Sequence, residues 1–298
     1  MGFVQGSNTL AAGKIKLGST DIDKIYFGST EAWPVSVPPA PTEFVSSWKT
    51  DNTSSGSSAS NQIKLPILNG GNYNFTVDWG DGSTVDTITA WFQAEATHTY
   101  SVAGTYSIII QGVIEGWTFN GIGDRNKFLS VTSWGVLKPL TINIFQGCEN
   151  LNLSTVSGVL DLSLNTSLGS AFLGCTSLTT INNVNSWGIS TITNMDSMFF
   201  NATSFNANIS AWDVSNVTNM PNMFYNATAF NQDLSGWCVT NISSKPGGFD
   251  GLTPAWVLPK PVWGTCPGAS TSCAIEGSAQ ASVPLFSCAI EGSAVRLI

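Results

Sequence analysis

The alternation of apolar and polar positions predicts short strands and turns along the chain. The runs YNFTVDWGDG (73–82) and GTYSIIIQG (104–112) alternate with the two-residue period of a strand that has one buried face. Asp81-Gly82 directly follows the first run and is a strong hairpin signal. Near the start, KIKLGST (14–20) returns as KIYFGST (24–30), and each copy has the pattern of a strand followed by a turn.

A longer repeat occupies the middle of the chain. Its phrases are spaced by 27, 27 and 25 residues: IFQGCENL (144–151), AFLGCTSL (171–178), MFFNATSF (198–205) and MFYNATAF (223–230). A tryptophan phrase recurs as SWGVL (133–137), SWGIS (186–190), AWDVS (211–215) and GWCVT (236–240), but the unit from 145 to 170 lacks it. Such a period predicts stacked units, each too small to bury its own aromatic side chains.

The repeat positions predict which side chains form the shared core. These are the recurring aromatic residues Phe145, Phe172, Phe199, Phe224, Trp187, Trp212 and Trp237. Cys148 and Cys175 stand where later repeats have Ala202 and Ala227. This exchange predicts a small buried site in which a thiol acts as a compact hydrophobe, and a redox role is the less favoured alternative.

Composition limits the classes of partner. Charged residues make up 10% of the 298 residues, against roughly 25% in an ordinary soluble domain. The net charge is −8 and lysine and arginine do not cluster, so binding of nucleic acid is not expected. No apolar run approaches the ~18 residues of a membrane helix. The six cysteines form no C-x-x-C pair, which disfavours zinc, and disulfides are expected only outside a reducing cytosol.

Two groups of polar residues near the first strands have a chemical and a structural interpretation. His98 is the only histidine, and we interpret it as structural because a serine-type triad needs a neighbouring serine and carboxylate. Asp78, Asp81 and Asp86 lie at short spacing and could hold calcium. Turn formation explains Asp81 without a metal, and we predict no metal site.

The repeats offer few acids for hydrolysis of glycosidic bonds, which needs two carboxyl groups in one cleft. The main ones are Asp196, Asp213 and Asp233, and neighbouring repeats have Gly188 and Cys238 in place of Asp213. We therefore predict that the chain is not an enzyme and uses no cofactor.

Sugar binding through the repeats is a further hypothesis. The repeat tryptophans would form a stacking ladder if they pointed outward, but their regular spacing favours the core. A ligand surface would instead use variable polar positions, namely Asn206, Asn208, Gln232 and Asp233.

Three stretches resemble known families. WGDGS (79–83) followed by HTYSVAGTY (98–106) resembles the PKD domain, which implies an Ig-like β-sandwich over about 65–112. The pattern MF-x-NA-T-x-F-N-x-x-(I/L)-S-x-W is similar to BspA-like leucine-rich repeats of surface proteins, which implies a curved β-solenoid used for adhesion. IKLGSTDIDKIYFGSTEAWP (15–34) resembles short repeats at the starts of phage tail and accessory structural proteins.

These patterns predict a mainly β chain in four parts. They are an N-terminal docking segment with a proline linker (1–41), a PKD/Ig-like β-sandwich (42–112), a BspA-like repeat solenoid (113–258) and a short β tail with a duplicated SCAIEGSA (259–298).

The resemblances together predict a bacteriophage virion protein of tail-fibre or head-decoration type. We expect it to form a homo-oligomer, to attach to other virion proteins through its N-terminal segment, and to contact host-surface or mucus glycans. The particle would assemble in the host cytoplasm, which needs no export signal. The alternatives are a bacterial cell-surface adhesin whose signal peptide is missing and a glycan depolymerase.

Overall fold

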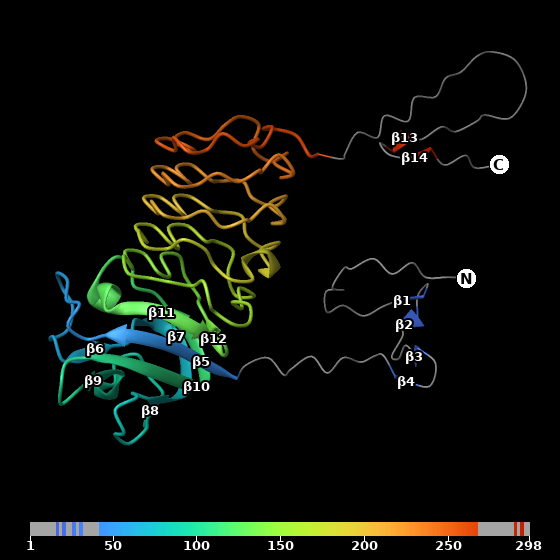
Figure 1. Ribbon diagram of the computed structural model, residues 1–298. Helices are drawn as coiled ribbons and strands as arrows, with labels where there is room; N and C mark the ends of the chain where they lie inside the picture. Colours follow the sequence, from blue (N-terminus) through green and yellow to red (C-terminus); the bar gives the residue numbers. More distant parts are fainter. Residues whose placement is uncertain are drawn as a thin grey trace, which may run out of the picture.

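The computed structural model describes residues 42–267 and, outside them, six strands of two residues each (Figure 1). These six pair as three antiparallel hairpins: β1 (Lys16–Leu17) with β2 (Thr20–Asp21), β3 (Tyr26–Phe27) with β4 (Thr30–Glu31), and β13 (Ala289–Ile290) with β14 (Ser293–Ala294). The rest of the predicted N-terminal docking segment, its proline linker and the rest of the tail beyond residue 267 lie outside the described residues.

The fold is mainly β, and its largest element is a six-stranded sheet. The strand order is β11-β5-β10-β7-β8, and β12 also pairs with β10. Their bounds are β5 Glu43–Lys49, β7 Ile67–Asp78, β8 Asp86–Ile88, β10 Thr105–Trp117, β11 Phe128–Ser133 and β12 Leu137–Lys138. Neighbours on this path are antiparallel, whereas β12 runs parallel to β10.

Side-chain alternation gives this sheet one buried face. Phe44 of β5 lies opposite Ile110 of β10, and Ile110 lies opposite Val77 of β7, so the three share a face and all are buried. The intervening residues, such as Val45 and Ser47, belong to the opposite face and are more accessible. The period-2 pattern of the sequence therefore determines which face of each strand is buried.

A smaller sheet of β6 (Gln62–Lys64) and β9 (Thr97–Thr99) packs against the large one, and the short helix η1 (Ala94–Ala96) precedes β9. The His98 ring of β9 stacks on Trp79 with centroids 5.0 Å apart, and Tyr100 stacks on Tyr106 of β10 at 3.8 Å. The second layer thus covers part of the buried face.

The sheet does not end at the predicted boundary between residues 112 and 113. Strand β10 continues to Trp117, which pairs with β7, while Ile114 and Glu115 pair with β12, and β11 pairs with β5. Burial explains the difference, because Trp117 and Phe128 pack around Trp48 in one aromatic cluster. The short helix η2 (Gly123–Asn126) connects β10 to β11.

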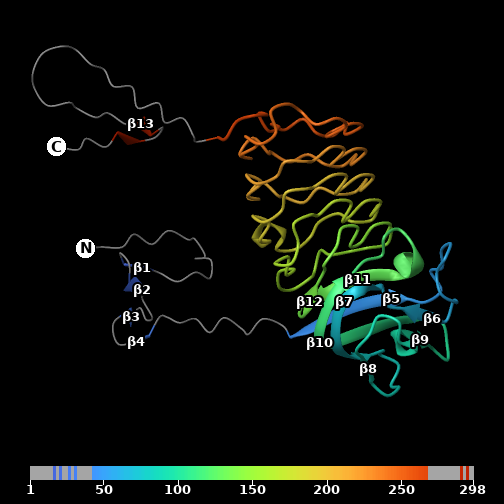
Figure 2. The same cartoon turned by 180° about the vertical axis from the view of Figure 1, so that it is seen from behind.

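The solenoid begins on β11, and its coils stack on that edge of the sheet (Figures 1 and 2). Ser130 and Ser133 of β11 form parallel bridges to Asn152 and Ser157 of the first coil. Successive coils are then joined by backbone hydrogen bonds from the N–H groups of Phe145, Phe172, Phe199 and Phe224, with N···O distances of 2.8, 2.9, 2.9 and 2.9 Å. The main sheet is therefore extended by the coils.

One repeat position requires a left-handed backbone. Gly147 and Gly174 have φ of 78° and 74°, and the corresponding Asn201 and Asn226 have φ of 57° and 56°. Asparagine is among the few non-glycine residues that adopt this region readily. This explains why the repeats exchange glycine for asparagine at this position.

The coil without a tryptophan phrase keeps the same stacking. Leu160 and Leu162 are buried in it, and Trp134 reaches across to Trp187 with ring centroids 6.2 Å apart. A short helix, η3 (Val184–Ser186), precedes Trp187. The smaller leucines thus leave room for the tryptophans of the coils on either side.

The coils continue past the predicted end at residue 258. Leu234 N donates to Pro259 O at 2.9 Å, and Val239 N donates to Thr265 O at 2.8 Å. In this last coil Asp250 forms ion pairs with Lys245 and Lys260. Charged groups on the outer face are typical of a terminal repeat, and this coil is the last one within residues 42–267.

Within the described part of the chain, no helix has the length and apolar character needed to cross a membrane.

Candidate binding surfaces

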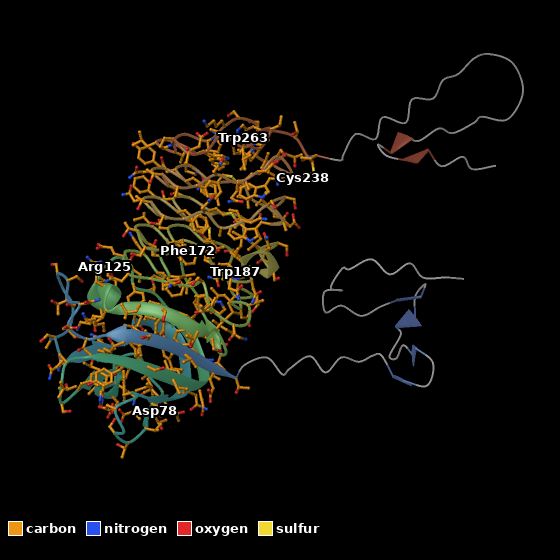
Figure 3. The ribbon with its side chains drawn as sticks, viewed as in Figure 1. Asp78, Arg125, Phe172, Trp187, Cys238 and Trp263 are labelled. Atoms are coloured by element: carbon orange, nitrogen blue, oxygen red, sulfur yellow. A yellow bond between two sulfur atoms is a disulfide. The ribbon has the colours of Figure 1, made fainter. Side chains whose placement is uncertain are left out.

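The aromatic residues predicted as repeat core lie inside the solenoid (Figure 3). One column of rings runs from the sheet through the coils, with centroid distances of 5.8, 5.5, 5.6 and 5.7 Å between Phe128, Phe145, Phe172, Phe199 and Phe224 in turn. The next ring, Phe249, meets Phe224 edge-on at 85°. The column therefore joins the core of the sheet to the core of the solenoid.

The tryptophans Trp187, Trp212 and Trp237 are also buried. The indole N–H of Trp212 donates to Val184 O at 2.8 Å, and that of Trp237 donates to Ile209 O at 3.2 Å. A buried indole N–H usually finds such a partner, but that of Trp187 has none within the described part of the chain. The repeat tryptophans consequently present no ring face to a ligand.

Both thiols of the repeat, Cys148 and Cys175, are fully buried. The Cys175 Sγ contacts Phe145 O at 3.1 Å, in hydrogen-bond geometry. Desolvation raises the pKa of both thiols well above the ordinary value. They are therefore held protonated and away from solvent, where a thiolate nucleophile would not form.

The four polar residues proposed as ligand contacts take part in coil contacts and turns. Gln232 Nε2 donates to Asn206 Oδ1 at 2.7 Å and to Asn206 O at 3.0 Å, which links two coils. Asn208 Oδ1 accepts from Ser210 N at 3.0 Å, and Asp233 Oδ1 accepts from Ser235 N at 3.0 Å. Asn206, Asn208 and Asp233 remain exposed, so ligand contact there stays a prediction.

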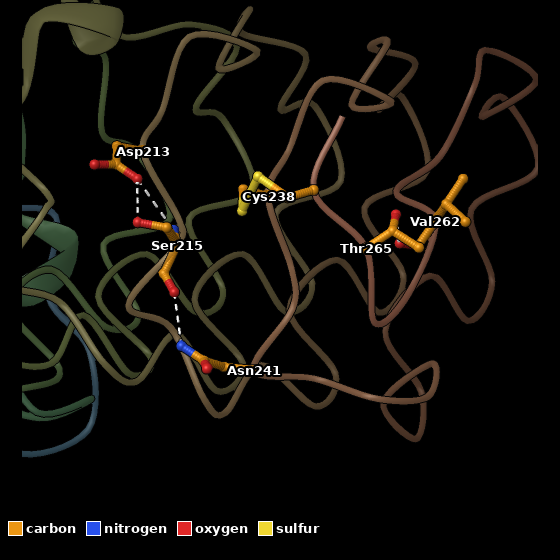
Figure 4. Close-up of a disulfide and its surroundings, with 7 residues drawn as sticks. Asp213, Ser215, Cys238, Asn241, Val262 and Thr265 are labelled. Carbon is orange, nitrogen blue, oxygen red and sulfur yellow. Dashed lines mark hydrogen bonds between the residues drawn. A yellow bond between two sulfur atoms is a disulfide. The ribbon is translucent and has the colours of Figure 1, made fainter. Parts of the chain in front are cut away.

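The repeat acids Asp213 and Asp233 hold turns of the same type at two different repeat positions. Each accepts hydrogen bonds from the serine two residues on, Ser215 or Ser235, through both its hydroxyl and its N–H group. These bonds lower the pKa of both carboxyl groups. Figure 4 shows the Asp213–Ser215 turn and the bond from Asn241 to Ser215 O of the coil before. A structural role explains both acids.

The loop after β7 uses its acids separately. Asp78 Oδ1 accepts from Gly80 N at 2.9 Å, and Asp86 Oδ2 accepts from Trp79 Nε1 at 2.8 Å. Asp81 pairs with His98, whose Nε2 lies 2.8 Å from Asp81 Oδ2. In the part of the chain that is described, no three His, Cys, Asp or Glu side chains form a group suited to a metal ion. The hydrogen bonds account for these carboxylates as turn-forming groups.

We expect the Asp81 carboxyl to make the free energy of unfolding sensitive to acid. Desolvation raises its pKa, but hydrogen bonds from Ser83 and His98 outweigh this and lower the pKa to about 2, from an ordinary 3.8. A carboxyl with a depressed pKa stabilises the fold above its unfolded pKa and loses that contribution as pH falls toward its folded pKa. We expect Asp81→Asn to destabilise the protein at pH 6 and the difference to shrink between about pH 4 and 2. Urea titrations at several pH values measure this, and a difference independent of pH would contradict it.

A disulfide joins Cys238 to Cys266 at the end of the solenoid (Figure 4). The two residues are 28 positions apart, and Val239 beside Cys238 pairs with Thr265 beside Cys266 through a 2.8 Å hydrogen bond. The bridge fastens the last coil to the coil before it. The repeat pattern did not reveal this pairing, because Cys238 occupies the position of an aspartate or glycine in other coils.

Removing this bridge should loosen the end of the solenoid. We expect Cys238→Ser with Cys266→Ser to lower the free energy of unfolding by about 2 to 4 kcal/mol. Without the bridge, the unfolded chain gains the conformational entropy that closure of a loop of this size removes. Denaturation of the oxidised and reduced native protein measures the same quantity without substitution. Equal midpoints in both redox states would contradict the prediction.

A buried ion pair lies where the sheet meets the first coil. Lys127 is 0% exposed and its Nζ lies 3.4 Å from Asp124 Oδ1. Nζ also donates to Ser58 O, Ala59 O and Gln62 O at 3.0, 2.8 and 2.8 Å. Burial lowers the pKa of Lys127, and Asp124 opposes that shift. The pair thus anchors the loop after β5 to η2.

A groove of about 530 Å³ borders this cluster, between the 56–67 segment and the 118–124 turn. Asp124 is among its lining residues, but both carboxylate oxygens already accept bonds, from Ser58 N and Oγ and from Lys64 N at 2.6 to 2.7 Å. Hydrogen bonds within the fold therefore occupy the Asp124 carboxylate at this groove.

Exposed aromatic side chains gather instead on the connection between β8 and β9. Trp91 is 43% exposed and Phe92 is 73% exposed. This pair was not among the predicted binding residues, although two adjacent aromatic residues interrupt the alternating pattern there. Adjacent residues of a strand face opposite sides of the sheet. Two adjacent aromatic residues therefore cannot both point into one core, and this pattern indicates that at least one of them is exposed.

Comparison with known proteins gives one match. A family model described as "Mycoplasma protein of unknown function, DUF285" matches residues 141–254. This region contains the repeats that resemble BspA-like sequences, and the match agrees with that resemblance in general terms. It does not extend to the sheet or to the N-terminal segment, where the PKD-like and phage-like resemblances stay predictions. No curated protein and no solved structure matches the chain.

Proposed function

We propose that this chain is a structural protein of a bacteriophage particle, of the tail-fibre or head-decoration type. Its sheet and solenoid form an adhesive unit displayed for contact with glycans of the host surface or of mucus. The N-terminal segment attaches it to other virion proteins, and the chain acts as a homo-oligomer.

The observation that carries the adhesive part of this proposal is the shared core. The column from Phe128 to Phe224 makes the sheet and the coils one scaffold, and the exposed polar groups of the coils are tied together by hydrogen bonds such as Gln232 to Asn206. A scaffold of this kind holds surface groups in fixed positions, which reduces the ordering cost of binding. The virion assignment is supported by the resemblance of residues 15–34 to phage structural proteins.

A cell-surface adhesin is the second candidate, and the family match over residues 141–254 favours it, since the matched description names a cellular organism. Both candidates place the repeats in contact with an outer surface. They differ in whether a phage particle or a bacterial cell carries the chain.

Mass spectrometry of gradient-purified phage particles separates the two. We expect peptides from the sheet and the solenoid in the particle fraction at a stoichiometry fixed relative to the capsid protein. Peptides confined to the envelope of uninfected cells would overturn the virion assignment and support the adhesin. Loss of polysaccharide viscosity on adding the purified protein would support a depolymerase and overturn the purely adhesive role.

A further inference from the structure

The aromatic pair on the connection between β8 and η1 forms an edge-to-face contact on the surface. The rings of Trp91 and Phe92 lie 5.8 Å apart between centroids and at 86° to each other. The two faces therefore form an exposed corner. This connection lies at the end of the molecule opposite the solenoid coils (Figures 1 and 2).

A side-chain lock holds the turn that carries the two rings. Gln93 Oε1 accepts hydrogen bonds from Thr89 N, from Thr89 Oγ1 at 3.1 Å and from Ala90 N at 2.7 Å. The Gln93 N–H closes the turn on Ala90 O at 3.3 Å, and its Nε2 donates to Thr87 O at 3.4 Å. Ala96 at the end of η1 is buried and anchors the segment. The exposed rings are thus mounted on an ordered turn.

The size of the aromatic corner indicates a small ligand. From the exposed fractions, the two rings offer about 250 Å² of apolar surface. A stable protein–protein interface needs roughly 800 Å² on each partner. The corner matches one or two sugar rings far better than it matches a protein surface.

The charges on the segment that carries the corner disfavour an anionic ligand, and the exposed cation Lys64 lies on the neighbouring strand β6, opposite Thr97. Residues 80–99 contain Asp81, Asp86 and Glu95 but no lysine or arginine. Phosphates, anionic lipid headgroups and sulfated polysaccharides all require cationic partners. A neutral pyranose fits, because its C–H face is apolar and its hydroxyl groups can donate to a carboxylate such as that of exposed Glu95.

We propose that the Trp91–Phe92 turn is a stacking site for a pyranose ring of a neutral glycan. This inference rests on the proposed glycan contact and assigns it to the sheet end of the molecule, away from the repeat positions Asn206, Asn208, Gln232 and Asp233. The indole face takes the C–H face of the sugar, and the phenyl ring borders its edge.

The test is isothermal titration of the full chain with three probes: hexamers of β-1,4-linked N-acetylglucosamine, hexamers of β-1,4-linked glucose, and neutral O-glycans released from mucin. Binding of at least one probe is expected. Trp91→Ala should weaken it at least about tenfold, as is typical when an aromatic anchor is truncated. Val257→Ala is the matched control, because it trims an apolar side chain that is 80% exposed in the last coil, and it should leave affinity unchanged.

The lock gives a second readout that keeps both rings. Gln93→Ala removes the acceptor for three donors and should weaken binding, whereas Gln93→Glu keeps an acceptor oxygen at that place, loses only the long Nε2 bond to Thr87 O, and should restore binding in part. Circular dichroism and the unfolding midpoint establish that each variant is folded. Loss of binding in Gln93→Ala with recovery in Gln93→Glu supports an ordered aromatic corner.

Three outcomes overturn the inference. One is an equal affinity of Trp91→Ala and the unsubstituted chain for a bound glycan, and another is the absence of binding to all three probes. The third is binding to vesicles of neutral phosphatidylcholine that depends on Trp91, which would make the corner a membrane contact. None of these outcomes moves the chain off the phage particle, so failure of this inference is distinguishable from failure of the virion assignment.

Discussion

Replacing Phe199 with alanine is expected to lower the free energy of unfolding by about 3 to 5 kcal/mol. Its ring lies in the middle of the column, 5.6 Å from Phe172 and 5.7 Å from Phe224 between centroids, and it also stacks on Phe205 at 3.9 Å. The loss leaves a cavity between coils that the backbone hydrogen bonds prevent from closing. Chemical denaturation followed by tryptophan fluorescence measures the change.

The neighbouring ring supplies the control. Phe200 stacks on Tyr225 at 5.0 Å, but it lies on the accessible side of the coil and is only partly buried. Phe200→Ala should therefore cost clearly less than Phe199→Ala. A near-neutral Phe199→Ala, or equal effects of the two substitutions, would contradict the assignment of the core column.

Replacing Lys127 with methionine is expected to cost about 3 to 5 kcal/mol as well, because it leaves the buried Asp124 carboxylate without its counter-charge. The ammonium group also satisfies three backbone carbonyls of the 58–62 loop. The loop should then lose its anchor at the junction of sheet and solenoid. Hydrogen exchange of residues 54–64 should rise in parallel with the loss of stability.

A surface pair provides the matched control for this substitution. Lys49 lies 3.8 Å from Asp51, and both side chains are about half exposed. Lys49→Met should change the free energy of unfolding by less than about 1 kcal/mol. If Lys127→Met were equally mild, the ion pair would not be holding the junction.

The sequence predicted those parts of the fold that depend on periodic burial. The repeat spacing identified Phe145, Phe172, Phe199 and Phe224 as equivalent positions, and the structure places them in one column. The prediction was possible because stacked coils bury the same position again and again. Single residues could be located without any knowledge of how the coils curve.

Features that depend on non-repeating contacts could not be predicted from the repeat spacing. The extension of the sheet through β11 and β12 depends on aromatic packing around Trp48, which no local pattern encodes. The Cys238–Cys266 bridge joins residues brought together only by the last coil. The exposed corner of Trp91 and Phe92 depends on the Gln93 lock, a single side chain in an irregular turn.

The measurement that tests the central claim most directly is immunogold electron microscopy of purified phage particles, with antibody raised against the solenoid coils. We expect label on the tail or on the capsid surface, which would place the chain on a displayed appendage. Unlabelled particles together with labelled envelopes of uninfected cells would contradict the virion assignment and leave the cell-surface adhesin in its place.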